Sequence, residues 1–186
     1  ENEGQARRLI EPVEAEVRRQ LGEYVYGTDE ETMASVVGGL LRQRGQKVAL
    51  AESCTGGLAA KLLTDIPGSS DYFAYGWVVY GNQAKTALLQ VAPESLSRFG
   101  AVSEPVAAEM AAHARKISGA DYGLGITGIA GPGGGTDEKP VGLVYIGLAS
   151  AENVDVRRLV FPGQREMVRM RAATAALNLL RLKLKI

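Results

Sequence analysis

The chain has 186 residues, of which 46% are hydrophobic and 23% are charged, as in an ordinary folded domain rather than a disordered chain. No apolar run reaches the roughly 18 residues that a membrane-spanning helix needs, and the balance of 21 basic against 21 acidic side chains argues against a dedicated nucleic-acid binder. The single cysteine excludes an internal disulfide, and the single histidine excludes a histidine-based metal cluster within one chain.

The first 31 residues are acidic, with nine carboxylates against four arginines and a net charge of −5. The residue pattern predicts a helix over 11–21 and a short strand over 24–26. We interpret this stretch as a linker or as the tail of a preceding domain. No positively charged, apolar leader is visible at the start, so we expect a cytoplasmic protein.

Strands and helices are predicted to alternate along the rest of the chain. Thr28 is expected to cap the first of these helices, because Glu31 completes a capping box, and Gly45 ends it. The strands are expected over 47–51, 74–80, 122–126, 141–148 and 154–161, and the further helices over 55–64, 82–89, 93–99, 103–117 and 165–182. This alternation predicts an α/β fold in which helices cover a sheet. The last two strands, expected to pair antiparallel, make that sheet mixed.

The segment Ala51-Glu-Ser-Cys-Thr-Gly-Gly57 joins a buried strand to a helix, which is where ligands bind in α/β sheets. Ser53 and Thr55 supply hydroxyl groups, and the two glycines allow a ligand to approach the backbone. Free N–H groups at the start of the helix favour an anion or an oxyanion. The alternative is that Ser53 or Thr55 only caps the helix. The segment matches neither the Walker phosphate loop nor the usual serine-hydrolase elbow.

A glycine-rich tract follows the third strand. Gly123-Leu-Gly-Ile-Thr-Gly128 matches G-x-G-x-x-G, but the first two glycines lie within the predicted strand and no helix can follow, so we reject a dinucleotide site. We interpret 128–140 as a wide loop whose N–H groups can hold a phosphate or a ribose. The alternative is a flexible surface loop with glycines at its turns.

Lys85 is the candidate base, because a lysine that is removed from water loses pKa and can accept a proton near neutral pH. The alternative is an exposed helix lysine, which is the commoner case. Cys54 is expected to be a small buried side chain, and His113 is expected on a helix surface. A Ser53–Lys85 pair is therefore more economical than a triad that uses the histidine.

Five short motifs follow one another along the chain. They are Ala51-Glu-Ser-Cys-Thr-Gly-Gly57, Tyr80-Gly-Asn-Gln-Ala-Lys85, Gly100-Ala-Val-Ser103, Gly128-Ile-Ala-Gly-Pro132 and Lys139-Pro-Val-Gly142. Together they resemble the C-terminal domain of the CinA family, whose stand-alone form is the PncC-type nicotinamide mononucleotide deamidase. The resemblance covers about 30–183, and it divides the chain into an acidic connector, 1–29, and a CinA C-terminal domain, 30–186. It implies a three-layer α/β/α sandwich with a mixed, mostly parallel sheet.

The resemblance also implies a reaction, the hydrolysis of nicotinamide mononucleotide to nicotinate mononucleotide and ammonia in pyridine-nucleotide salvage, with no metal and no cofactor. Ser53 is the implied nucleophile and Lys85 its base, and Tyr80 is expected as a third catalytic residue. The start of the helix at Thr55 is expected to hold the oxyanion, and the loop over 127–135 to surround the ribose phosphate. The expected substrate-binding residues are Thr55, Gly56, Gly57, Thr127, Gly128, Ala130, Gly131 and, as a phosphate ligand, Arg165.

Two other functions stay open on the sequence. The same glycine-rich loops are compatible with a regulatory module that binds a pyridine nucleotide without turnover. The competence name of the family suggests instead an interaction module in DNA uptake or damage response, although a net charge of zero argues against direct DNA binding. We expect no nucleic-acid partner and no membrane partner, and a homodimer is compatible with the sequence.

Overall fold

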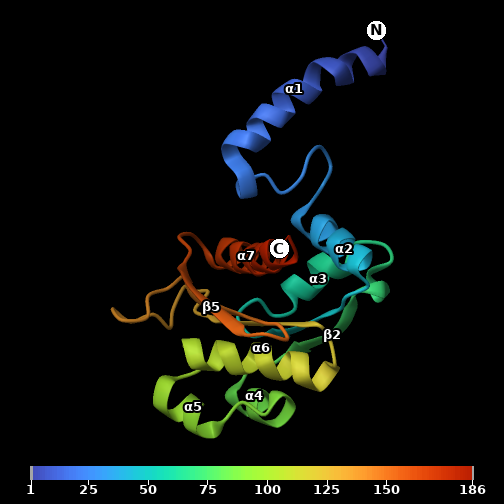
Figure 1. Cartoon of the computed structure of the whole chain (residues 1–186). Helices are drawn as coiled ribbons and strands as arrows, with labels where there is room; N and C mark the ends of the chain where they lie inside the picture. Colours follow the sequence, from blue (N-terminus) through green and yellow to red (C-terminus); the bar gives the residue numbers. More distant parts are fainter. Residues whose placement is uncertain (1, 186) are drawn as a thin grey trace.

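The computed structural model describes residues 2–185, and its centre is a five-stranded sheet with helices on both faces (Figure 1). The strands are β1 Val48–Glu52, β2 Phe73–Val78, β3 Tyr122–Gly128, β4 Leu143–Ala149 and β5 Val154–Val160. They lie in the order β2-β1-β3-β4-β5. β1 pairs in parallel with β2 and β3, whereas β4 pairs antiparallel with β3 and β5. Only β4 runs against the other strands, which confirms the mixed, mostly parallel sheet.

Two helical layers complete the α/β/α sandwich. The helices are α1 Glu3–Leu21, α2 Met33–Arg44, α3 Leu58–Thr64, α4 Asn82–Leu89, α5 Pro93–Phe99, α6 Glu104–Ser118 and α7 Arg165–Leu184, with 3-10 turns at Gly22–Tyr24 and Ser69–Asp71. α2, α3 and α7 lie on one face of the sheet, and α4, α5 and α6 lie on the other (Figure 1). Because side chains alternate along a strand, Val48 and Leu50 of β1 pack into the first core, and Ala49 and Ala51 pack into the second.

The glycines of β3 allow helix α6 to pack closely on the sheet. A Cβ atom at Gly123 would lie 2.1 Å from the carbonyl oxygen of Ala111, and one at Gly125 would lie 2.6 Å from that of Ala107. Both carbonyls belong to the backbone of α6, which cannot move away cheaply. Gly123 and Gly125 lie inside β3, as predicted. The G-x-G-x-x-G pattern therefore has a packing cause and does not mark a dinucleotide site.

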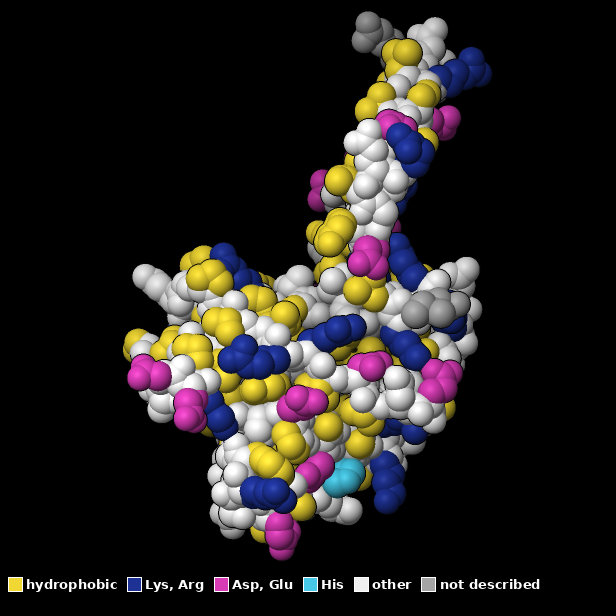
Figure 2. All heavy atoms as spheres, turned by 60° about the vertical axis from the view of Figure 1, so that its left-hand side comes forward, with side chains coloured by type: hydrophobic (Ala, Val, Ile, Leu, Met, Phe, Trp, Pro, Cys, Tyr) yellow, Lys and Arg dark blue, Asp and Glu magenta, His cyan; other side chains and the backbone are white. Residues whose placement is uncertain are grey.

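Helix α1 projects away from the body of the molecule, and none of its residues is buried (Figures 1 and 2). It begins at Glu3, not at Glu11 as predicted, and continues through Pro12. Proline lacks the N–H that a helix interior uses, so it is a signal for a helix start rather than a helix middle. Of the helices within residues 2–185, none combines the length and the apolar character that crossing a membrane requires.

Two other predictions about the connector are wrong. The segment 24–26 is not a strand, since its first residue ends a 3-10 turn and the next two are irregular. Helix α2 is capped by Thr32, which forms a capping box with Ser35, and not by Thr28. The N–H of Thr28 does donate to the Glu31 carboxylate at 2.8 Å. A helix cannot start there, however, because Asp29 has a left-handed φ of 50°.

Candidate active site

Ser53 lies on a tight turn between β1 and α3, residues 53–57, which we call the Ser53 turn. Helix α3 begins at Leu58, three residues later than predicted. Gly56 and Gly57 have φ values of 61° and 91°, which a right-handed helix does not contain. The turn is closed by a hydrogen bond from the N–H of Gly56 to the carbonyl of Ser53 at 3.1 Å. Ser53 is thereby held at the carboxyl end of β1, where ligands bind in sheets of this type.

Lys85 Nζ lies 3.0 Å from Ser53 Oγ, although the two residues are 32 positions apart in the chain. Lys85 comes from the first turn of α4, which follows β2, the neighbour of β1 in the sheet. The exposed fraction is 8% for Ser53 and 1% for Lys85. The structure therefore brings together the two residues predicted as nucleophile and base, and Lys85 is not an exposed helix lysine.

Burial is the feature of its surroundings that favours the neutral form of the Lys85 amine. Burial lowers the pKa of Lys85 below its ordinary value, because removal from water disfavours the ammonium. Nζ also lies 2.8 Å from the carbonyl oxygen of Val79 and 3.1 Å from that of Tyr80. A neutral amine has two N–H donors and one lone pair. When the amine is neutral, its two donors serve these carbonyls, and its lone pair is left to accept the hydroxyl proton of Ser53.

The other two candidate reactive side chains do not take part in this pair. Burial raises the pKa of the Cys54 thiol to about 11, so the thiol stays protonated near neutral pH and is a poor nucleophile. His113 is half-buried, rather than on the surface as predicted, and its Nδ1 lies 2.6 Å from the carbonyl oxygen of Leu89. Within residues 2–185, no group of three or more His, Cys, Asp or Glu side chains gathers as a set of metal ligands.

The Tyr80 hydroxyl contacts Arg165 rather than the Ser53–Lys85 pair. Arg165 Nη2 donates to this hydroxyl at 2.9 Å, and Arg165 Nη1 donates to the carbonyl of Gly131 at 2.9 Å. Tyr80 is 59% exposed, and only its backbone carbonyl contacts Lys85. In this structure, the phenol predicted to be the third catalytic group therefore lies with the predicted phosphate ligand.

A cavity of about 270 Å³ joins these groups. Of the predicted residues, it is lined by Ser53, Tyr80, Lys85, Thr127, Gly128, Ala130, Gly131 and Arg165. Thr55, Gly56 and Gly57 do not line it, because the Ser53 turn carries them toward α3. The lining also includes Cys54, Ala101, Val102 and Ile129, which lie within the quoted motifs but were not predicted as site residues.

Thr127 shapes the cavity through its buried side chain. Its hydroxyl donates to the backbone carbonyl of Ala101 at 2.8 Å, so it joins the end of β3 to the loop before α6. Lys139 adds a hydrogen bond to the carbonyl of Phe99, the last residue of α5, at 2.7 Å. These two contacts hold the segment that carries the lining residues Ala101 and Val102.

The start of α3 is not the free oxyanion site that the sequence suggested. The N–H groups of Gly57, Ala59 and Ala60 all donate to the carboxylate of Glu52. Within residues 2–185, the N–H group of Cys54 donates to no other residue. The free donor beside Ser53 therefore belongs to the turn itself and not to the helix. One sequence feature could have indicated this contact of Glu52. It is a carboxylate at the end of a buried strand, directly before a turn that contains glycines.

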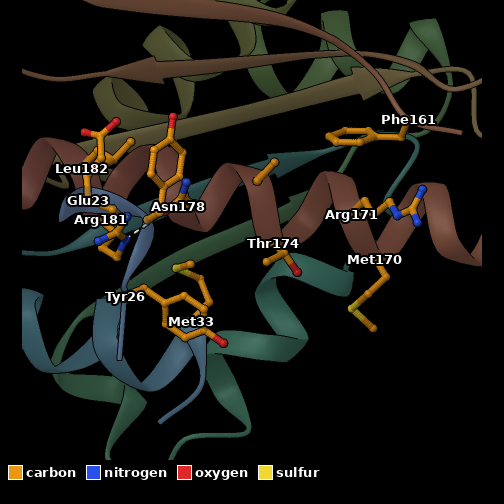
Figure 3. A pocket seen from close by; sticks show the side chains of 12 residues that line it. Glu23, Tyr26, Met33, Phe161, Met170, Arg171, Thr174, Asn178, Arg181 and Leu182 are labelled. Carbon is orange, nitrogen blue, oxygen red and sulfur yellow. Dashed lines mark hydrogen bonds between the residues drawn. The ribbon is translucent and has the colours of Figure 1, made fainter. Parts of the chain in front are cut away.

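A second cavity, of about 400 Å³, lies along the outer face of α7 (Figure 3). Its lining includes Met33, Phe161, Asn178 and Arg181, with Arg181 held by a hydrogen bond to the backbone carbonyl of Glu23 at 2.6 Å. None of the predicted site residues lines it. It is larger than the Ser53 cavity, but it lacks a nucleophile next to a base, and we therefore assign the candidate active site to the Ser53 cavity.

Known proteins resemble the chain over most of its length. It is 53% identical to a protein of Moorella thermoacetica named as competence-damage inducible, over 94% of this chain and 42% of that protein. It is 51% identical to a CinA-like protein of Thermosynechococcus vestitus, over 100% of this chain and 45% of that protein. The chain thus spans less than half the length of these relatives.

Solved structures agree with the sequence relatives. The crystal structure of the competence/damage inducible protein CihA from Agrobacterium tumefaciens superimposes with a TM-score of 0.81 and 40% identity, over 87% of this chain and 99% of that one. A CinA superfamily protein from Klebsiella pneumoniae gives a TM-score of 0.79 and 34% identity, over 82% and 96%. The model of the CinA C-terminal domain matches residues 30–184. The chain therefore belongs to the CinA family, through its C-terminal domain.

Proposed function

We propose that the chain is an amidohydrolase that converts nicotinamide mononucleotide to nicotinate mononucleotide and ammonia, a reaction of pyridine-nucleotide salvage. The observation that carries the proposal is the 3.0 Å contact between Ser53 Oγ and Lys85 Nζ on the wall of the cavity. A hydroxyl beside a buried amine at this distance suits a nucleophile–base pair. The five motifs that resemble the deamidase form of the family support the same reaction.

In the acylation step, the neutral Lys85 amine accepts the hydroxyl proton of Ser53 while Oγ bonds to the carboxamide carbon. The carbonyl electron pair moves to the oxygen, which gives a tetrahedral oxyanion. When this oxyanion collapses, the C–N bond breaks, and the nitrogen takes the proton from Lys85 and leaves as ammonia. The products of this half-reaction are ammonia and an ester on Ser53.

In the deacylation step, Lys85 removes a proton from water while the water oxygen bonds to the ester carbon. Collapse of the second tetrahedral intermediate breaks the bond to Ser53 Oγ, which takes the proton back from Lys85. The N–H group of Cys54 is our candidate for holding the oxyanion in both steps, since Cys54 adjoins Ser53, lines the cavity, and has an N–H that is free among the described residues. A donor of this kind contributes about 3–4 kcal/mol in other hydrolases.

The charge of the cavity supports an anionic substrate. Its charged lining side chains are Lys85 and Arg165, with no carboxylate among the lining residues. Once Lys85 is neutral, Arg165 is the remaining cation, and its planar guanidinium suits a phosphate. Gly128, Gly131, Gly133 and Gly134 also line this cavity, and without side chains they let a ligand approach the backbone. A ligand with a carboxamide at one end and a phosphate at the other fits this arrangement.

Incubation of the purified chain with nicotinamide mononucleotide tests the proposal, with ammonia and nicotinate mononucleotide measured together. We expect both products to appear in equal amounts. Saturable binding of the nucleotide without ammonia, even at high protein concentration, would instead identify a nucleotide-binding module. Free nicotinamide serves as a control, because it has the carboxamide but not the phosphate that Arg165 is proposed to bind.

A further inference from the structure

The buried carboxylate of Glu52 has no part in the mechanism above, yet it is the residue directly before Ser53. Glu52 ends β1 and is 1% exposed. Its Oε2 accepts the N–H groups of Gly57 and Ala59, both at 3.1 Å, and its Oε1 accepts that of Ala60 at 2.8 Å. One side chain thus binds the backbone on the far side of the Ser53 turn.

The backbone of Glu52 is fixed as firmly as its side chain. Its carbonyl accepts the N–H of Val79 at 2.8 Å, and the next N–H, that of Ser53, donates to the carbonyl of Ile126 at 2.9 Å. These bonds tie it to the segment after β2 on one side and to β3 on the other. The Ser53 turn therefore follows Glu52, whose backbone is held in the sheet. It leads into helix α3, whose first turn is held by the side chain of Glu52.

Arg169 of α7 holds the middle of the turn. Its Nη2 donates to the carbonyl of Thr55 at 2.7 Å. The turn contains two glycines with positive φ, which leave an unconstrained chain unusually free. Glu52 and Arg169 together remove this freedom. The two contacts come from different layers of the fold, so neither is a consequence of the other.

We propose that Glu52 is the positioning residue of the Ser53–Lys85 pair, with its carboxylate holding the Ser53 turn so that Oγ meets Nζ. This inference rests on the proposed serine–lysine mechanism, and Glu52 itself touches no reacting atom. A displacement of about 1 Å between reacting groups can cost about 100-fold in rate. The carboxylate is the suitable group because all three partners are donors, and a carboxylate accepts without donating.

The variant Glu52→Gln tests this role with nearly the same shape. The amide offers one acceptor oxygen and turns an NH₂ group toward at least one backbone N–H, so the turn loses part of its anchor. We expect kcat for ammonia release to fall about 30- to 100-fold while KM changes less than about threefold. A group that served only the overall stability of the fold would lower the unfolding temperature without this separation of kcat from KM.

The matched control is Tyr72→Phe. Tyr72 is fully buried, and its hydroxyl donates to the carbonyl of Leu63 in the last turn of α3 at 3.0 Å. This variant removes a buried hydrogen bond from the same helix but at the end away from Ser53. We expect a loss of stability like that of Glu52→Gln, with kcat within about twofold of the parent chain. An equal loss of kcat in both variants would overturn the proposal, since general loosening of α3 would then explain it.

A second readout does not depend on the substrate. A small arylsulfonyl fluoride forms a covalent ester with an activated serine, and mass spectrometry measures its rate of attachment to Ser53. We expect Glu52→Gln to slow this attachment about as much as it slows kcat, and Tyr72→Phe to leave it unchanged. Attachment to Glu52→Gln at the parent rate would overturn the proposal.

The two readouts separate the failure of this inference from that of the proposed function. If Ser53 is labelled but nicotinamide mononucleotide releases no ammonia, the substrate assignment is wrong and the labelling rates still decide the role of Glu52. If Ser53 is not labelled in the parent chain, no activated serine exists and both proposals fail. If Glu52→Gln does not fold, Arg169→Met replaces it, with the exposed Arg171→Met as its control. We then expect a roughly tenfold loss of labelling for Arg169→Met only.

Discussion

Burial, rather than a charged partner, sets the behaviour of Lys85. Removal from water is the largest cause that lowers its pKa, and no carboxylate lies in the cavity to oppose it. The carbonyls of Val79 and Tyr80 hold the amine in place without adding a charge. The residue can therefore be neutral where an exposed lysine would be an ammonium, which is what a general base requires.

The pH dependence of the reaction follows from this lowered pKa. The protonated amine cannot accept the Ser53 proton, so kcat/KM is expected to rise with pH and to level off once Lys85 is neutral. The midpoint of the rise should lie below 10.5, the ordinary lysine value. Initial rates of ammonia release across a pH series measure it. A rate that stays constant or falls over the whole series would show that Lys85 is not the base.

Arg165 is expected to act mainly on substrate binding. It bridges Tyr80 and Gly131 at the cavity and has no carboxylate partner among residues 2–185. Arg165→Met should raise KM for nicotinamide mononucleotide about 10- to 100-fold, the range of a charged hydrogen bond, and change kcat less. Steady-state kinetics with Arg171→Met as the control tests this. A loss confined to kcat would assign Arg165 to the chemistry instead.

Three of the four arginines of helix α7 reach different parts of the molecule. Arg165 contacts the cavity, Arg169 contacts the Ser53 turn, and Arg181 contacts the connector through the carbonyl of Glu23. The helix also packs its apolar residues against the first core. A single element thus contacts both the Tyr80–Gly131 part of the cavity and the Ser53 turn.

The close packing of α6 against β3 predicts that one methyl group added at a glycine of β3 lowers the free energy of unfolding. Gly125→Ala would bring a Cβ to 2.6 Å from the Ala107 carbonyl, and overpacking against backbone should lower the free energy of unfolding by about 3 kcal/mol. Gly39→Ala on the exposed side of α2 meets no atom within 4 Å and should raise it by about 0.5–1 kcal/mol. Urea unfolding of both variants measures the difference. Equal stabilities would contradict the packing account.

Helix α1 is expected to be unnecessary for the folding of the remaining chain. No residue of α1 is buried. The hydrogen bond from Arg181 of α7 to the carbonyl of Glu23 does not involve α1, so we expect it to form without this helix. A chain that lacks residues 1–21 should keep its unfolding temperature to within about 3 °C and its rate of ammonia release. Thermal unfolding and the ammonia assay check both. A large loss of stability would mean that α1 packs on the domain.

Features with local causes could be predicted from the sequence. Helices α4 and α5 have the bounds expected from their apolar spacing and from Pro93. The sequence rules for helix starts and caps were satisfied at two positions where the structure differs. Pro12 is typical of a helix start but lies inside α1, and Asp29 has a left-handed backbone, so that no helix begins at Thr28.

The candidate site needed more than local patterns. Ser53 and Lys85 lie 32 residues apart, and their pairing was expected from the family resemblance and from the preference for Lys85 over His113 as the base. Two contacts were not predicted, that of Glu52 with the start of α3 and that of Arg169 with Thr55. The first contact spans a turn whose shape depends on positive φ at two glycines, which a sequence pattern does not specify. The second contact joins residues 114 positions apart, so no local sequence pattern contains both.

Ammonia release from nicotinamide mononucleotide by Ser53→Ala and Lys85→Met tests the serine–lysine mechanism. Ser97→Ala and Lys61→Met, at exposed positions, serve as their controls. We expect each site variant to lose at least about 1000-fold in rate while remaining folded, and both controls to keep the parent rate. A Ser53→Ala protein that releases ammonia at the parent rate would contradict the serine–lysine mechanism.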